Sequence, residues 1–187
     1  MLRRSRVLDW LVTLALAVGF VLVFEAEIAK PYRIPSSSME PTLHCAKPGA
    51  WCEGSFNDRI LVDRLIYRFE SPKRGQIVVF HPPHSAAAHG CPGGTFVKRL
   101  IGLPGDVVSE RNGRVSVNGV RLHEPYVSPA FRDHETVTWH VPAGRYFFMG
   151  DDRSHSCDSR IWGTVPRDNL VGPVMLTYWP PGRISFH

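Results

Sequence analysis

The sequence lacks several patterns that define common enzymes and binding proteins. It has no C-x-x-C motif, so thiol redox catalysis has no sequence basis, and no G-x-S-x-G motif of the kind that carries the nucleophile in α/β-hydrolases. The formal net charge is +5, but beyond the first residues Lys and Arg are scattered, so we expect no nucleic-acid partner. No internal repeat or low-complexity tract stands out. The 187 residues therefore suit one domain of ordinary size and a small additional segment.

That additional segment is the first 30 residues. Three arginines within residues 1–6 precede an almost wholly apolar run from Leu8 to Phe24. As a helix this run spans about 25 Å, slightly less than the roughly 30 Å hydrocarbon core of a bilayer. A cleavable signal peptide needs small residues at the first and third positions before the cut, and the residues from Phe24 to Lys30 offer no such pair. We therefore predict a retained single transmembrane anchor in residues 1–30, with the N-terminus in the cytoplasm and the lipid bilayer as a partner.

Residues 31–187 form the outer domain in this prediction, and they show no long segment of helical period. Asn112-Gly113 and Asn118-Gly119 are strong tight-turn dipeptides, and the first is expected to close a hairpin. Short β-branched runs recur between turn residues, at 59–62, 76–80, 95–101, 107–108, 115–117, 145–149 and 174–178. Such runs are typical of an antiparallel β domain, so we predict a mainly β fold.

The four cysteines fit an exported domain, where disulfides persist. Cys45 and Cys52 are close enough in sequence to close a small loop, whereas Cys91 and Cys157 have no evident partner, and connectivity stays open. The segment from His81 to Cys91 contains His and Cys residues, but their spacing matches no closed zinc pattern. We interpret it as a flexible surface loop, and we expect neither a metal nor another cofactor.

A run of three serines between prolines, in the stretch from Ile34 to Leu43, raises the question of a nucleophile. A serine hydroxyl attacks only when a base takes its proton. None of the nine histidines lies in a recognisable setting, although a Ser-His-Asp triad stays open because its members need not be near in sequence. Lysine is the other candidate base, and it must be neutral, which requires its pKa of about 10.4 to fall by roughly three units through desolvation. Lys98 suits this role because it shares one face of an apolar strand with Phe96, while Val97 points to the other.

Three segments together closely resemble the bacterial type I signal peptidases. They are residues 34–43, residues 95–106 (TFVKRLIGLPGD) and residues 150–163 (GDDRSHSCDSRIWG), and with an apolar N-terminal run and D-R-I-L-V-D at 58–63 they follow that family's order. The resemblance covers nearly the whole chain. It implies a membrane-anchored serine endopeptidase that removes signal peptides from exported preproteins at A-x-A sites, with its catalytic domain on the outer face of the cell membrane. It implies no obligatory protein partner.

The resemblance also implies a role for each matching residue. Ser38 corresponds to the nucleophile and Lys98 to its general base. The Ser36 hydroxyl and the Ser38 backbone N–H correspond to the oxyanion hole, and Ser156 to the serine that orients the lysine. The remaining matches are the ion pair Asp158 and Arg160, which supports the site, and the substrate-binding residues Ile34, Pro35, Met39, Phe96 and Val97.

Some residues depart from the family pattern. Asp152 stands where asparagine is usual, Ser154-His155 replaces an Asp/Asn pair, and Cys157, interpreted as a packing residue, replaces a small or apolar one. Two other functions compete with a signal peptidase. A repressor-type self-cleaving Ser/Lys protein would carry an N-terminal DNA-binding domain. A non-catalytic anchored β module would gain nothing from Ser38, Lys98 and Ser156 in these contexts.

Overall fold

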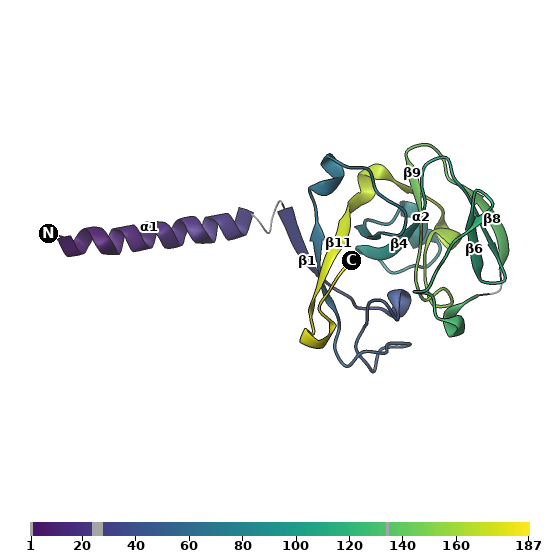
Figure 1. Ribbon diagram of the computed structural model, residues 1–187, viewed down its shortest axis with the longest axis horizontal. Helices are drawn as coiled ribbons and strands as arrows, with labels where there is room; N and C mark the ends of the chain where they lie inside the picture. Colours follow the sequence, from purple (N-terminus) through teal and green to yellow (C-terminus); the bar gives the residue numbers. More distant parts are fainter. Residues whose placement is uncertain (1, 24–27, 134) are drawn as a thin grey trace.

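The computed structural model describes residues 2–23, 28–133 and 135–187, and within the first of these ranges it describes side chains for residues 7–21. Helix α1 (Leu2–Val23) projects from a β-rich body, and the strand that follows it, β1 (Ala29–Arg33), already belongs to a sheet (Figure 1). Phe24 and the neighbouring residues 25–27, on which the predicted end of the apolar run and the cleavage-site argument depend, lie outside the described residues.

The larger of two sheets has eight strands. Its order is β1-β2-β11-β3-β4-β9-β10, with β12 paired to β11, and all of its pairings are antiparallel. These strands are β2 (Arg59–Asp63), β3 (Ile77–Phe80), β4 (Phe96–Gly102), β9 (Arg145–Met149), β10 (Val165–Pro166), β11 (Leu170–Trp179) and β12 (Ser185–Phe186). The predicted mainly antiparallel β fold is confirmed, and the predicted strand at 174–178 is part of the longer β11.

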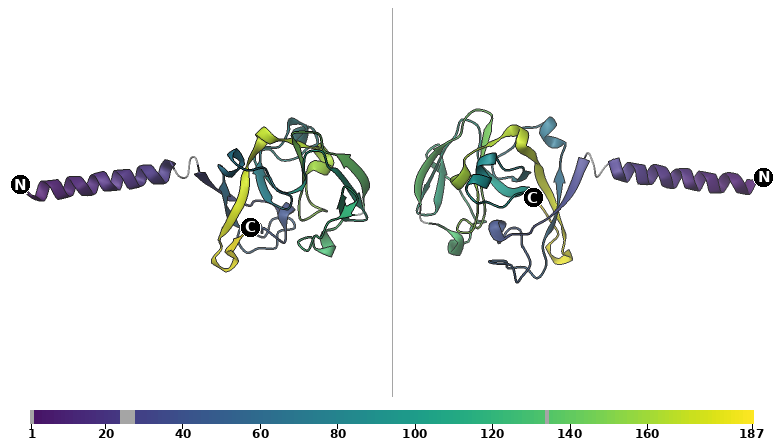
Figure 2. Two further views of the ribbon diagram at one scale, coloured as in Figure 1. Left: turned by 45° about the horizontal axis from the view of Figure 1, so that its top comes forward. Right: turned by 180° about the vertical axis from the view of Figure 1, so that it is seen from behind.

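The smaller sheet lies at the end of the body away from α1, as the different views in Figures 1 and 2 agree. Its strand order is β7-β6-β5-β8, and its members are β5 (Val107–Arg111), β6 (Arg114–Val117), β7 (Val120–Arg121) and β8 (Thr136–His140). Asn112 and Gly113, with φ angles of 49° and 68°, make the tight turn between β5 and β6. A type I′ hairpin turn requires positive φ angles at both of its central residues, as found here, so the predicted hairpin is confirmed.

Short helical segments fill the connections between strands. The α-helices are α2 (His84–Ala88) and α3 (Ser159–Trp162), and the 3-10 helices are η2 (Ser37–Met39), η3 (Ile66–Arg68), η4 (Pro129–Phe131), η5 (Arg167–Asn169) and η6 (Pro181–Arg183). An aromatic core lies against the middle of the large sheet, where the rings of Phe80 and Phe148 stack with centroids 4.4 Å apart. Such close ring packing makes the centre of this sheet a rigid support for the strands beside it.

Two disulfides tie loops to this body. One joins Cys45 and Cys52, as the sequence allowed, and the other joins Cys91 and Cys157, for which the sequence offered no partner. The segment from His81 to Cys91 is therefore not the flexible loop that we predicted. It contains α2, buries Ala86, and is attached through Cys91 to the chain beside Ser156.

The side chains of α1 that the structure describes are exposed, including those of Trp10 and Phe20. Within the described part of the chain, no helix combines the length and the apolar character needed to cross a membrane.

Candidate active site

Ser38 lies on η2, which follows β1 after the short connection of residues 34–36. The Ile34 N–H donates to the Asp58 carbonyl (2.9 Å) and its side chain is buried with Met39 in an apolar cluster, so this segment is held from both sides. Ser38 is only 7% exposed. The Ser36 hydroxyl oxygen lies 3.5 Å from the Ser38 hydroxyl oxygen, which places two hydroxyls at one point on the surface.

Lys98 reaches Ser38 from β4. Its Nζ donates a hydrogen bond to Ser38 Oγ, across 60 residues of sequence, and its side chain is only 5% exposed. Phe96 lies on the same face of β4, with its ring centroid 5.5 Å from Lys98 Nζ. Burial lowers the pKa of Lys98 to about 8, although the nearby carboxylates of Asp158 and Asp151 act in the opposite direction. Near neutral pH a usable fraction of this lysine is therefore neutral and able to accept a proton.

A third segment, residues 150–160, closes the site from behind. The Asp152 N–H donates to the Ser38 carbonyl (3.2 Å), which joins this segment to the nucleophile candidate. Ser156 is buried beside it, but its hydroxyl makes no well-formed hydrogen bond with the described residues. Gly150 has no room for a side chain, because a Cβ there would overlap Ser156 Oγ and the Ser38 carbonyl oxygen.

We expect Gly150→Ala to lower the turnover of whatever reaction Ser38 supports by about 100-fold, since displacing reacting groups by roughly 1 Å costs that much. The added methyl group would overlap both Ser156 and the Ser38 carbonyl oxygen, so at least one of these residues must shift. Thermal unfolding and activity should be measured together, with Gly182→Ala as the control because a Cβ at Gly182 meets open space. Full activity of a folded Gly150→Ala protein would contradict this packing argument.

Asp158 and Arg160 form the ion pair expected from the sequence. Arg160 binds Asp158 through two nitrogens (both 2.9 Å), and Asp158 also accepts the Gly150 N–H (2.9 Å). Burial acts to raise the pKa of Asp158, but the Arg160 guanidinium and the Gly150 N–H outweigh it and hold that pKa below its usual range. The pair therefore stays ionised and fixes the position of Gly150.

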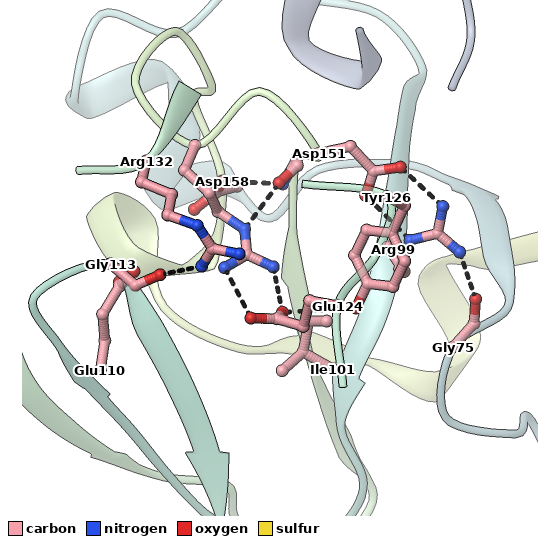
Figure 3. A network of polar contacts seen from close by, with 12 residues as sticks. Gly75, Arg99, Ile101, Glu110, Gly113, Glu124, Tyr126, Arg132, Asp151 and Asp158 are labelled. Carbon is pink, nitrogen blue, oxygen red and sulfur yellow. Dashed lines mark hydrogen bonds and ion pairs between the residues drawn. The ribbon is translucent and has the colours of Figure 1, made fainter. Parts of the chain in front are cut away.

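A second buried ion pair was missed in the sequence, although both of its members lie in the matching motifs. Arg99 contacts Asp151 through two nitrogens (2.8 and 2.6 Å) and lies 3.8 Å from the centroid of the Tyr126 ring (Figure 3). Asp151 also accepts a hydrogen bond from the Thr42 hydroxyl (2.5 Å). One carboxylate thus connects the serine segment, the lysine strand and the third segment. The signal available in the sequence was Arg99, a charged residue next to the candidate base Lys98 in an otherwise apolar strand.

These three segments surround a cavity of about 310 Å³. Ser36, Ser38 and Lys98 line it, together with all five residues expected to bind substrate: Ile34, Pro35, Met39, Phe96 and Val97. Ser156 is not among its lining residues, whereas His155 and Cys157 are. Among the described residues no histidine bonds to Ser38, and Lys98 alone supplies a nitrogen base there.

One group of ligand-type side chains lies beside the site. Glu40, His44 and Glu53 have donor atoms within 4.8 Å of one another. The buried Glu40 carboxylate is already bonded to His44 and to the backbone N–H groups of Cys45 and Glu53 (both 3.0 Å). These contacts indicate that Glu40, His44 and Glu53 stabilise the loop closed by the disulfide of Cys45 and Cys52.

The comparisons with known proteins agree with this geometry. Residues 7–179 match the family model described as "Signal peptidase, peptidase S26". The chain belongs to the signal peptidase I family. It is 37% identical over 183 residues to "Signal peptidase I" of Leptolyngbya laminosa, covering 97% of this chain and 84% of that protein. It is 39% identical to "Probable signal peptidase I-2" of Synechocystis sp., covering 92% and 73%, and 34% identical to "Signal peptidase I" of Mycobacterium tuberculosis, covering 97% and 75%.

The signal peptidase is therefore a serine endopeptidase that removes signal peptides from preproteins, as the sequence resemblance implied. Family membership excludes the non-catalytic β module and the repressor-type protein as descriptions of this chain. Proteins of this family are membrane-associated.

Proposed function

We propose that this signal peptidase cuts preproteins after an A-x-A sequence, with Ser38 as the nucleophile and Lys98 as its general base. The observation that carries the proposal is the hydrogen bond from Lys98 Nζ to Ser38 Oγ inside the cavity, made by a lysine whose burial lowers its pKa to about 8. A neutral amine in contact with a serine hydroxyl is the arrangement that activates the hydroxyl.

In this mechanism Lys98 takes the Ser38 proton as Oγ attacks the scissile carbonyl. The Ser36 hydroxyl and the Ser38 backbone N–H stabilise the resulting oxyanion, and loss of one such donor typically costs about 2.7 to 4 kcal/mol. Protonated Lys98 then donates its proton to the leaving amine, which leaves an acyl ester on Ser38. Neutral again, Lys98 removes a proton from the attacking water, and hydrolysis releases the signal peptide. The ion pair of Asp158 with Arg160 supports Ser38 through Gly150, whereas the hydrogen bond expected between Ser156 and Lys98 is not present among the described residues.

The cavity walls support a preference for small side chains next to the cut. Ile34 and Met39 are 2% and 1% exposed and belong to the buried apolar cluster, so they have little freedom to make room for a larger group. Val97 packs against the same cluster, and Pro35 and Phe96 complete the walls. An extended preprotein segment lying between the end of β1 and the start of β4 would present its first and third residues before the cut to these walls.

We also propose that residues 1–30 anchor the enzyme in the cell membrane, with the cytoplasmic end at the arginines of residues 1–6 and residues 31–187 on the outer face. The apolar side chains of α1 that the structure describes, among them Leu11, Leu14 and Leu16, are exposed and make no core with the β domain. A lipid bilayer is the solvent that such a surface prefers.

The test is cleavage of a preprotein by the detergent-solubilised full chain, with the product mapped by mass spectrometry. We expect one cut, directly after the second alanine of an A-x-A site. A matched preprotein with phenylalanine in place of that alanine should be cut at least about tenfold more slowly, because the apolar walls exclude the larger side chain. Equal cleavage of the two preproteins, or a cut elsewhere, would contradict the proposed specificity.

A further inference from the structure

Trp51 occupies an unusual position in the loop that follows the nucleophile segment. Its indole is 63% exposed, and its backbone φ is +61°, in the left-handed region that a bulky side chain rarely adopts. The loop around it is held rigidly: Cys52 is bonded to Cys45, and the Lys47 N–H donates to the Gly54 carbonyl (2.9 Å). A strained and exposed tryptophan on a rigid loop is the kind of feature that is associated with a binding function.

The Trp51 ring is held against His155. The two rings stack with centroids 4.1 Å apart and an interplanar angle of 22°. His155 is itself fixed, because its Nδ1 lies 3.0 Å from a carboxylate oxygen of Asp152, and its backbone N–H donates to the same carboxylate (3.0 Å). Asp152 is fully buried. The stacked pair is therefore attached to the third segment, residues 150–160, through the buried Asp152.

His155 lines the substrate cavity, and Trp51, which does not line it, is joined to the cavity by its stacking on the His155 ring. The walls proposed to bind residues before the cut are Ile34 with Pro35 and Phe96 with Val97. His155 comes from the third segment, which bonds to the Ser38 carbonyl through Asp152 (3.2 Å). The two walls account for the chain before the cut, so the remaining lining of the cavity, which includes His155, is left for the chain after the cut.

We propose that Trp51 and His155 form a binding subsite for the first residues after the cut, the start of the mature protein, and that it favours large apolar or aromatic side chains there. This inference rests on the proposed function of the same site. The exposed face of Trp51 offers an apolar surface, and stacking on His155 holds the ring so that little side-chain entropy is lost on binding. Trp51 is then a specificity residue and His155 positions it.

An exposed tryptophan can also bind to a lipid surface. We favour the substrate because the partner ring, His155, belongs to the cavity that contains Ser38 and Lys98. The experiment separates the two by comparing detergent micelles with lipid vesicles.

The experiment uses the full chain in detergent and two preproteins that differ only in the first two residues after the cut, Phe-Phe or Gly-Gly. We expect Trp51→Ala to raise KM for the Phe-Phe preprotein by about five- to tenfold, the size of one aromatic contact, with kcat unchanged and the Gly-Gly preprotein unaffected. Trp51→Phe should restore most of the affinity. His155→Ala should have a similar effect that adds little to that of Trp51→Ala in the double variant.

Phe69→Ala serves as the matched control, since Phe69 is an 81% exposed aromatic residue that does not line the cavity. An equal loss on both preproteins, a loss in kcat, or no loss would overturn the inference. So would an effect of Trp51→Ala seen only in vesicles, which would instead assign Trp51 to a lipid contact. Failure of the proposed function gives a different result, because Ser38→Ala would then retain cleavage.

Discussion

Replacing Ser38 with alanine is expected to reduce preprotein cleavage by about 10⁶-fold, as loss of the nucleophile does in other serine proteases. The side chain is buried in the cavity and bonded to Lys98, and among the described residues no other hydroxyl contacts that amine. Removing Oγ leaves Lys98 with nothing to activate except water. The rate should be measured under single-turnover conditions, with the acyl-enzyme followed by mass spectrometry.

Ser37→Ala is the matched control for this substitution. Ser37 is the adjacent residue on η2 and is equally buried, at 7% exposed, yet its hydroxyl bonds to no group of the site. We expect this variant to keep most of the activity. Substantial cleavage by Ser38→Ala, at the same bond, would show that another group attacks the substrate.

Lys98→Met is expected to lower the rate by roughly 10² to 10⁴-fold, the usual contribution of a positioned general base. Methionine fills nearly the same buried space without a proton acceptor, so the domain should remain folded. Lys98→Arg should not restore activity, because a guanidinium stays protonated and cannot act as the base. Thermal unfolding of both variants provides the check that a loss of rate is not a loss of structure.

The pH dependence of the wild-type enzyme follows from the same residue. Burial lowers the pKa of Lys98 to about 8, so below that pH the lysine is mostly protonated and inactive as a base. The logarithm of kcat/KM should therefore rise by about one for each pH unit below 8 and become constant above it. A rate that falls as pH rises through 8, or that does not change, would contradict a neutral lysine as the base.

The predicted fold was most accurate where the chain carries a strong local signal. Asn112-Gly113 requires two positive φ angles and so marks its hairpin, and the run from Arg145 to Met149 matches β9. Strand β1 was not predicted, because Pro31 and charged residues interrupt its apolar pattern and its pairing with β2 decides the conformation. The two-residue strands β7, β10 and β12 are too short to leave a pattern.

The candidate site was predicted through its motifs, and the structure adds the contacts between them. The motifs single out Ser38 and Lys98, but only the fold brings their side chains into contact. The pairing of Cys91 with Cys157 spans 66 residues and has no local signal, since a disulfide depends on proximity in space. The stacking of Trp51 on His155 could not be predicted for the same reason, because it depends on two distant loops lying close together in space.

The contacts of Asp151 with Thr42 and Arg99 make the site depend on residues that lie far apart in the chain. These residues come from three distant parts of the chain, and Asp151 is separated from Thr42 by 109 residues. Closing such large loops costs chain entropy, which the packing of the surrounding sheet must offset. A chain that ends before Asp151 therefore lacks the carboxylate that joins the three segments of the candidate site.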